Sequence, residues 1–269
     1  MASASLPGYG PEKALDECFG TRWIAGWGKN VVPTAETTPI NWQWTTNEPG
    51  ADWQKENFAT ANWEGGPSGF GRSDTPNAIV HTAWTTSDIW MRKEFDLSAE
   101  ELQRPLQLRM FHDDDAEIYL NGVRAAQRGG YNQAYEQVEI SAEAKAALRA
   151  GKNCLAVHGK QTGGGQFIDV GLTMSVPAWW QVDLGEVKSV QRTEISFNLP
   201  TEITPYVLEW SADGAKWEVY ANHLNDTVYE SPKGDHLPVQ ARYFRINFPE
   251  SVNHAVPTGI WEFKAYNAP

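Results

Sequence analysis

Short runs of alternating apolar and polar residues recur along this chain, separated by residues that favour turns. The clearest example is YVLEWSADGAKWEVY, residues 206–220, in which two strand-like runs flank Asp213 and Gly214. Successive side chains of a strand point to opposite faces, so this alternation indicates strands with one buried face. An Asp-Gly pair between two such runs predicts a tight hairpin turn. Because long helical periodicity is nearly absent, the pattern predicts an all-β fold built as a sandwich.

Only two short helices are predicted. Ser98 and Glu101 have the spacing of a capping box, and Pro105 is expected to stop the helix that they begin. Ser141 is expected to cap the second helix, which Gly151 closes. No segment repeats with a period of about 20 to 50 residues, so neither a solenoid nor a propeller is indicated.

Length and charge narrow the range of functions. The 269 residues exceed the usual domain size of roughly 100 to 150 residues, so two domains are expected. The 22 Lys and Arg residues are outnumbered by 34 Asp and Glu residues, and the formal net charge is -12. This balance argues against nucleic acid as a partner, because binding to phosphates depends on basic side chains. No apolar run of about 18 residues is present, so no membrane-spanning segment is expected.

The chain start and the cysteines carry little information about targeting. MASASLPGYG lacks the basic region and apolar stretch of a signal peptide. Two cysteines, Cys18 and Cys154, do not form a disulfide framework, and two free thiols are favoured over a bridge.

The 13 Trp residues exceed what a core of this size needs. Trp fills cores well, but its flat apolar face with a polar edge is also the surface on which sugar rings stack. Alternation with polar neighbours predicts that five of them are buried, namely Trp23, Trp90, Trp180, Trp217 and Trp261. Trp179 precedes a residue that should face inward, so it is expected to face outward.

Segments near both ends of the chain resemble the discoidin family, the coagulation factor V/VIII type C fold, which includes the family 32 carbohydrate-binding modules. These segments are ALDECFGTRW (14–23), WWQVDLGEVKSVQRTEISF (179–197), YVLEWSADGAKWEVY, ARYFRINF (241–248) and GIWEFKAYN (259–267). They occur in the order typical of that family. Their spacing is also normal except between Trp23 and Trp179, where the family usually has a short loop.

The long gap resembles the sugar-binding jelly-roll domain at the N-terminus of family 2 glycoside hydrolases. The matching segments include WQWTTNEPGADWQKENFATANWEGGPSGFG (42–71), DIWMRKEFDL (88–97), DDDAEIYLNG (113–122) and LRAGKNCLAVHGKQTGGGQFIDVGL (148–172). Together the two resemblances imply two galactose-binding-like β-sandwich (jelly-roll) domains, one inserted in a loop of the other. The host is expected at residues 1–34 and 176–269, and the inserted domain at residues 35–175. Exposed loop tips tolerate such insertions.

The discoidin resemblance also implies a calcium ion with a structural role. In sugar-binding modules of that family, carboxylates, a Thr hydroxyl and backbone carbonyls hold the ion, and oxygen ligands suit this hard cation. The resemblance assigns Asp16, Thr21 and Glu262 as side-chain ligands. It places the carbonyl ligands near Ala14, Cys18 and Ala265. The alternative is a loop closed by hydrogen bonds without a metal.

Sugar sites on β-sandwiches lie in loops at one end, where an aromatic ring stacks on the sugar and polar side chains fix its hydroxyls. Three host loops could form such a site: TRWIAGWGKN (21–30), FNLPTEIT (197–204) and PESVNHAVPTG (249–259). The candidate ligand-binding residues are Arg22, Trp27, Trp179, Asn198, Asn253 and His254. The alternative for Trp27 is packing under the inserted domain. For Asn198 and Asn253 it is turn capping, and for His254 it is a solvated position in the loop. Trp27 and Trp179 flank the insertion, so a composite cleft between the two domains is expected.

The acidic run HDDDAEIYLNG, residues 112–122, is a weaker candidate for a metal site. Neighbouring residues of a strand point to opposite faces, so three consecutive Asp residues cannot converge without a turn. The run is therefore predicted to order the turn before a strand, and Asn121 with Gly122 to form a tight hairpin turn.

No catalytic framework is evident in the sequence. Glycoside hydrolysis ordinarily needs two facing carboxyl groups, and family 2 enzymes place theirs in a barrel that this chain lacks. The two resemblances therefore imply a non-catalytic carbohydrate-binding module of a secreted or cell-surface bacterial polysaccharide-degrading enzyme. Its partners would be a polysaccharide or oligosaccharide and a catalytic domain of the full-length protein. The alternatives are a structural or protein-interaction module that orients a catalytic domain, and a hydrolase without a recognisable motif.

Overall fold

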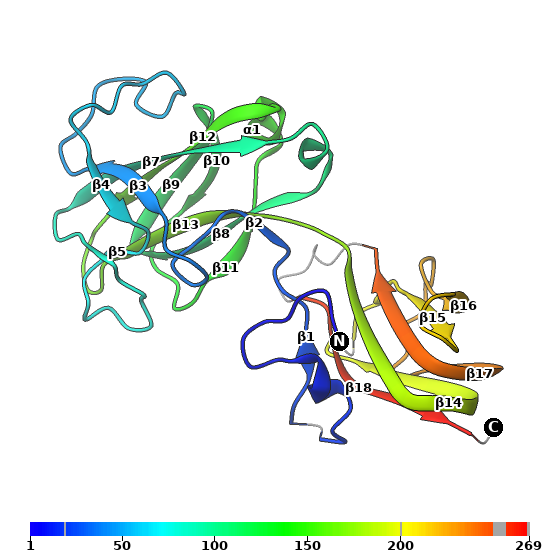
Figure 1. Ribbon diagram of the computed structural model, residues 1–269. Helices are drawn as coiled ribbons and strands as arrows, with labels where there is room; N and C mark the ends of the chain where they lie inside the picture. Colours follow the sequence, from blue (N-terminus) through cyan, green and yellow to red (C-terminus); the bar gives the residue numbers. More distant parts are fainter. Residues whose placement is uncertain (19, 200, 250–256, 268–269) are drawn as a thin grey trace. The chain divides into compact units, whose positions relative to one another are not determined.

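The computed structural model divides the chain into two compact units (Figure 1). It describes all residues except 19, 200, 250–256 and 268–269. Unit 1 comprises Met1–Gly28 and Ser175–Pro269, and unit 2 comprises Lys29–Met174. The first boundary follows Gly28 rather than residue 34, because β2 (Lys29–Val32) pairs with β13 (Phe167–Met174) of unit 2.

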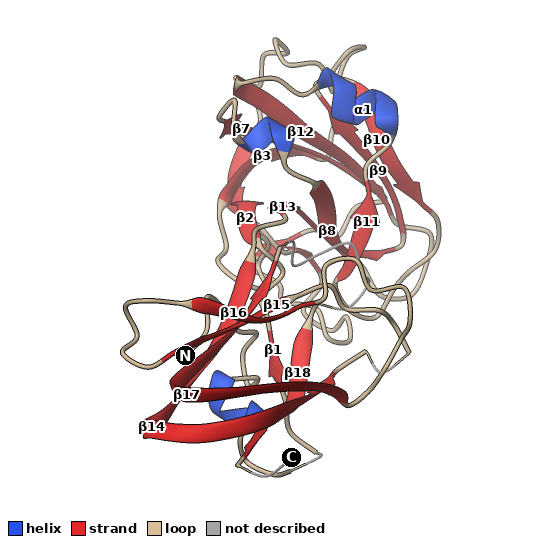
Figure 2. Ribbon diagram, turned by 90° about the vertical axis from the view of Figure 1, so that its right-hand side faces the viewer, coloured by secondary structure: helices blue, strands red, loops and turns tan. Residues whose placement is uncertain are grey.

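Strands make up almost all of the regular structure, which confirms the all-β prediction (Figure 2). The predicted capping box forms: Glu101 donates its backbone N–H to Ser98 Oγ (3.1 Å), and Ser98 donates its own to Glu101 Oε2 (2.7 Å). The helix after it, η2 (Glu101–Gln103), is a single 3-10 turn, because residue 104 becomes extended before Pro105. The second predicted helix is α1 (Ala142–Ala147), and Ser141 Oγ caps it by accepting the Ala144 N–H.

The 3-10 turn η1 (Pro11–Ala14) begins at a proline whose fixed φ suits the first helical position. The described part of the chain has no helix with the length and hydrophobicity needed to cross a bilayer.

Unit 1 contains one six-stranded sheet in the order β1-β18-β14-β17-β15-β16. Its strands are β1 (Trp23–Ile24), β14 (Ala178–Phe197), β15 (Val207–Ser211), β16 (Glu218–Asn222), β17 (Lys233–Phe248) and β18 (Gly259–Tyr266). The predicted hairpin turn joins β15 to β16, and Gly214 adopts φ 77° there. Such a positive φ is accessible to glycine without the steric cost that a side chain adds.

The sheet of unit 1 folds over on itself because β14 and β17 are long and bent (Figure 1). Their pairing is interrupted between Asp183 and Lys188, which marks the bend. Phe248 pairs with Ala178 at the start of β14, yet its ring lies 6.4 Å from the ring of Phe197 at the other end. The two ends of β14 therefore face each other across the sandwich. We call this side the loop end, formed by the described residues of segments 25–28, 198–206, 223–232 and 257–258, and the opposite side the bend end.

Aromatic side chains fill the core of unit 1. Trp23 and Trp180 are fully buried, as predicted, and Trp179 faces outward beside Trp180. The prediction of burial is wrong for Trp217 and Trp261, which are half-exposed. Trp261 lies at a register shift, where Glu262 pairs with Ser196 but Ile260 pairs with Phe197. The shift interrupts the alternation on which the prediction depended.

Unit 2 is a sandwich of two sheets, with strand orders β10-β9-β12-β7-β3-β4 and β11-β8-β13-β5-β6, and with β2 beside β13. The strands of the first sheet are β3 (Asn41–Thr45), β4 (Glu64–Pro67), β7 (Asp88–Leu97), β9 (Asp115–Leu120), β10 (Val123–Arg128) and β12 (Gly151–Lys160). The other strands are β5 (Phe70–Gly71), β6 (Thr82–Ala83), β8 (Leu106–Asp113) and β11 (Glu136–Glu139). Burial alternates along β9, so the first sheet keeps one outward face.

The acidic run of unit 2 organises loops. Asp114 Oδ2 accepts the Thr162 N–H (2.6 Å), the Thr162 hydroxyl (2.7 Å) and the Gly163 N–H (2.8 Å). Asp115 Oδ1 accepts the Gly130 N–H (2.7 Å). The predicted turn after β9 forms with φ 49° at Asn121 and 86° at Gly122.

Both cysteines are free thiols, as predicted. Cys18 is exposed in unit 1, and Cys154 is buried in β12 of unit 2. Burial raises the pKa of Cys154 to about 11, so this thiol is poorly reactive near neutral pH.

A buried carboxyl group ties the first loop of unit 2 to its core. Asp169 in β13 is fully buried, and its Oδ2 accepts the Ala35 N–H (2.7 Å) and the Tyr135 hydroxyl (2.5 Å). Burial raises the pKa of Asp169 to about 7, and the hydrogen bonds oppose this rise. The neutral carboxyl group is therefore the form that folding favours.

The raised pKa makes the stability of unit 2 dependent on pH. The contribution of Asp169 is complete below its unfolded pKa of about 4 and is lost as the pH rises through about 7. Between pH 5 and 8, we expect the parent chain to lose about 2 kcal/mol more unfolding free energy than Asp169→Asn. Hydrogen exchange of β13 peptides across a urea series measures this difference. An equal loss of unfolding free energy in the parent and in Asp169→Asn would contradict a raised pKa at Asp169.

Candidate functional site

Described residues from each of the three loops predicted to hold a ligand meet at the loop end of unit 1. Ala25 donates its N–H to the Thr258 carbonyl (2.8 Å), and Asn198 donates its N–H to the Gly259 carbonyl (3.0 Å). The Asn198 side chain accepts the Gly259 N–H (2.6 Å) and donates to the Pro257 carbonyl (2.9 Å). A Cβ at Gly259 would lie 2.4 Å from the Trp23 carbonyl, so only glycine permits this close approach.

The candidate ligand-binding residues occupy different places. Trp27 is half-buried in the loop after β1, and Asn198 fixes two loops to each other. Asn253 and His254 lie outside the described residues.

Arg22 and Trp179 take part in separate cation–π contacts on strand faces. The guanidinium of Arg22 lies 4.3 Å from the ring centroid of Trp261. On another face, Arg245 lies 5.4 Å from Trp179 and 3.9 Å from Trp217. Such contacts are typical of outward-facing aromatic residues beside basic side chains.

A fourth loop at this end, residues 223–232, was not identified from the sequence. His223 is bonded through Nδ1 to Asp226 Oδ2 (2.8 Å) and through Nε2 to Asp235 Oδ1 (2.9 Å). Lys233 lies 2.9 Å from Asp226, and this bond contributes most to lowering the pKa of that carboxyl. The network fixes both ends of the loop.

The fixed loop presents apolar side chains to solvent. Tyr229 is 45% exposed and Val228 is 74% exposed, while Ile203 of the neighbouring loop is 38% exposed. A narrow cavity of about 20 Å³ lies between the two loops, and Glu230 and Lys233 also line it. An aromatic ring therefore lies beside both acidic and basic hydrogen-bonding groups.

The group assigned to calcium forms a compact loop. Asp16 Oδ2 accepts the Thr21 hydroxyl (2.6 Å), and Asp16 Oδ1 accepts the Cys18 N–H (3.1 Å). Glu262 is only 5% exposed, and burial chiefly raises the pKa of its carboxyl, with a further contribution from the charge of Asp16. Two carboxylates thus approach each other beside hydroxyl and carbonyl oxygens, which is a donor set suited to a hard cation.

The remaining assigned positions differ in their surroundings. Ala14 is fully buried in η1, and the Cys18 carbonyl accepts the Thr21 N–H and hydroxyl. Ala265 pairs with Thr193 and lines a cavity at the bend end. Within the described residues, no three His, Cys, Asp or Glu side chains are grouped closely enough to hold a metal by themselves.

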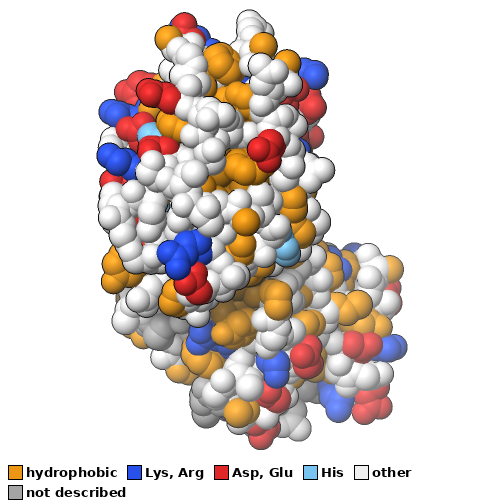
Figure 3. Space-filling view, turned by 90° about the vertical axis from the view of Figure 1, so that its left-hand side faces the viewer, with side chains coloured by type: hydrophobic (Ala, Val, Ile, Leu, Met, Phe, Trp, Pro, Cys, Tyr) orange, Lys and Arg blue, Asp and Glu red, His pale blue; other side chains and the backbone are white. Residues whose placement is uncertain are grey.

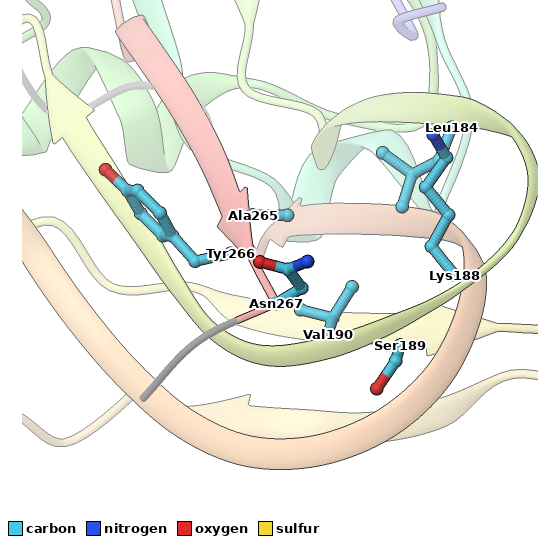
Figure 4. Close-up of a pocket in the computed structure, with 7 residues that line it drawn as sticks. All are labelled: Leu184, Lys188, Ser189, Val190, Ala265, Tyr266 and Asn267. Atoms are coloured by element: carbon cyan, nitrogen blue, oxygen red, sulfur yellow. The ribbon is translucent and has the colours of Figure 1, made fainter.

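The cavity at the bend end has a volume of about 590 Å³ (Figure 4). It is lined by Leu184, Lys188, Ser189, Val190, Ala265, Tyr266 and Asn267. Arg192 lies 3.7 Å from the ring centroid of Tyr266, and the Tyr266 hydroxyl donates to Glu194 (2.8 Å). One face of the Tyr266 ring is therefore covered, which makes this cavity less suited to sugar stacking than the loop end.

Comparison with known proteins identifies one domain family. The F5/8 type C domain family matches residues 139–263, a range that begins within unit 2 and includes β14 to β17 and most of β18. Residues 1–28, which supply β1 to the same sheet, lie outside the match. No curated protein sequence matches the chain.

Several solved structures resemble parts of this chain. A structure described as "Glycoside hydrolase" is 42% identical over 34% of this chain and 20% of its own, with a TM-score of 0.30. CpGH89CBM32-6 from Clostridium perfringens is 22% identical over 35% of this chain and 69% of its own, with a TM-score of 0.28. A glycosyl hydrolase family 2 member from Bacteroides cellulosilyticus DSM 14838 is 13% identical over 84% of this chain and 35% of its own, with a TM-score of 0.40.

The chain spans only about a fifth of the first of these structures. The family match falls mainly on the bent sheet of unit 1, where the sequence segments that resemble the discoidin family also lie. Residues 139–263 are therefore similar to the F5/8 type C, or discoidin, domain family.

Proposed function

We propose that this protein is a non-catalytic carbohydrate-binding module of a secreted bacterial polysaccharide-degrading enzyme. The observation that carries the proposal is the exposed ring of Tyr229 on a fixed loop at the loop end of a discoidin domain. Sugar rings stack on exposed aromatic faces, and charged side chains hydrogen-bond to their hydroxyls. The F5/8 type C match and the binding modules among the similar structures are consistent with this role.

The loop that carries Tyr229 is held in place before any ligand binds. His223 connects Asp226 to Asp235, and Lys233 connects Asp226 to Glu230 (3.3 Å from Lys233). A site that is already ordered loses less conformational entropy on binding, which favours affinity.

The carboxyl groups at this end suit binding better than hydrolysis. A glycosidase needs one carboxyl group with a raised pKa opposite a second, ionised one. Here Lys233 and His223 lower the pKa of Asp226, which keeps that group ionised. A catalytic domain elsewhere in the full-length protein would supply hydrolysis, and attachment to this module would raise its local concentration on the polysaccharide.

Calcium is proposed as a structural ion at Asp16, Thr21 and Glu262. The ion would neutralise the Asp16 and Glu262 carboxylates, of which Glu262 is buried. Asp16 and Thr21 belong to the N-terminal segment and Glu262 to β18, so the ion would join the two parts of unit 1.

Removal of the Tyr229 ring should weaken glycan binding. We expect Tyr229→Ala to bind its polysaccharide about ten-fold more weakly, because it loses the stacking surface. Tyr229→Phe should bind within about two-fold of the parent, since the ring remains. Affinity gel electrophoresis against a panel of plant and microbial polysaccharides measures this difference.

Val219→Ala is the matched surface control, because Val219 is 56% exposed on β16, away from the loop end. Equal retention of Tyr229→Ala and the parent on every polysaccharide would contradict the loop-end site. If neither protein is retained on any of them, the glycan-binding role fails, and a module that orients a neighbouring domain becomes the better account.

Calcium should stabilise unit 1 through the Asp16 group. An ion at about 100 times its dissociation constant adds about 2.7 kcal/mol to the unfolding free energy. We therefore expect calcium chloride, compared with a chelator, to raise the Tm of the parent but not that of Glu262→Gln. Glu186→Gln is the control, because Glu186 is an exposed carboxylate at the bend end. An equal effect of calcium on all three proteins would exclude this site.

A further inference from the structure

The outward face of the first sheet of unit 2 has a pocket of about 290 Å³. Its polar lining comes from three adjacent strands: Asp115 and Glu117 from β9, Gln127 and Arg128 from β10, and His158 and Lys160 from β12. We call it the strand pocket. Its volume is near the lower limit of small-molecule sites, which is roughly 300 Å³. The strands, rather than mobile loops, fix the positions of its side chains.

The register explains why these side chains meet. Glu117 pairs with Gln127 on one side and with His158 on the other, and Asp115 pairs with Lys160. Directly paired residues of antiparallel strands project from the same face of the sheet. On the opposite face, neighbours such as Ile118 and Val157 are fully buried in the core.

An imidazole ring forms one wall of the strand pocket. The ring of His158 stacks on the ring of Trp90, with centroids 4.8 Å apart and planes 7° apart. Trp90 lies on β7, on the side of β12 away from β9, so the other face of the imidazole is turned toward the pocket. Asp88 fixes this orientation through its contact with His158 Nε2 (2.9 Å).

The strand pocket contains acidic, basic and neutral polar groups. The Tyr119 hydroxyl donates a hydrogen bond to Glu117 Oε2 (2.9 Å), and the Gly130 N–H donates one to Asp115 Oδ1. Each of these carboxylates keeps a second oxygen as an acceptor. Among the described residues, Lys160 is exposed and makes no ion pair, and its charge acts on Asp88 at longer range. Gln127 adds an amide that can both donate and accept.

The mixed charges of the strand pocket disfavour charged ligands. Asp115 and Glu117 repel anions, while Arg128 and Lys160 repel cations, so neither kind of ion is favoured. A sugar hydroxyl donates and accepts at once, which matches donors and acceptors placed side by side. On the face of the molecule shown in Figure 3, acidic and basic side chains are likewise interspersed among neutral ones.

We propose that the strand pocket binds one ring, or two, of a neutral saccharide, with the ring edge against His158 and the hydroxyls on the carboxylates, Lys160 and Gln127. This site goes beyond the loop-end site and does not depend on it. A chain with both sites would be bivalent, and two weak sites on one polysaccharide act together through effective concentration.

The test is NMR titration of the ¹⁵N-labelled full chain, following the amides of Glu117, Gln127 and His158. The probes are galactose, glucose, xylose, arabinose, lactose and cellobiose, with glucuronate and glucosamine as charged comparisons. We expect at least one neutral probe to shift these amides in the parent. In Lys160→Ala its affinity should fall about ten-fold, because a charge-assisted hydrogen bond is lost.

Two control variants separate this proposal from the loop-end site. Lys152→Ala removes an exposed lysine of the same strand, outside the pocket, and should bind as the parent does. Tyr229→Ala should also leave these shifts unchanged, so failure of either site is seen separately. The proposal is overturned if no neutral probe shifts the three amides, if a charged probe binds there more tightly, or if Lys160→Ala with Gln127→Ala binds as tightly as the parent.

Discussion

Two buried tryptophans join the parts of unit 1 that the inserted unit separates in sequence. Trp23 pairs with Ile260 of β18, and its indole N–H donates to the Ala4 carbonyl (3.2 Å) and to Ser5 Oγ (3.0 Å). Trp180 donates its indole N–H to the Pro11 carbonyl (2.9 Å). Both rings are fully buried, and burial of such a ring contributes roughly 1.5–3 kcal/mol. The N-terminal segment is thus a structural part of the six-stranded sheet of unit 1.

The proposed site depends on the way in which the sheet of unit 1 folds over on itself. Bending of β14 brings Phe197 opposite Phe248, and the loops that leave these strands therefore emerge at one end. Asn198 then fixes two of these loops, and the His223 network fixes a third. The rigid sheet supplies the positions, while the loops supply the chemistry that selects a ligand, which is a common division of roles in β-sandwiches.

Features that depend on local sequence were predictable. Alternation and turn residues identified the hairpin around Gly214 and the turn at Asn121, because both follow from backbone preferences of a few residues. Features that depend on distant partners were not. Exposure of Trp261 follows from a register shift against β14, and the boundary after Gly28 follows from the pairing of β2 with β13.

In the candidate site, too, some features were predictable from the sequence and others were not. Convergence of the loops near Asn198 was expected from the family resemblance, since the order of segments fixes the order of strands. The network of His223, Asp226 and Asp235 was not expected, because its members form no motif and meet only through the path of one loop. The role of Asn198 as a link between loops also depends on the Gly259 backbone, which a sequence pattern cannot place.

The central claim is that the loop end of unit 1 binds glycan. The most direct measurement is a crystal structure of the chain with an oligosaccharide from the polysaccharide that retains it most strongly. The account predicts a sugar ring against Tyr229, with hydroxyls bonded to side chains of the 198–206 and 223–232 loops. A sugar bound in unit 1 only at the bend-end cavity beside Leu184 and Tyr266, with the loop end empty, would contradict it.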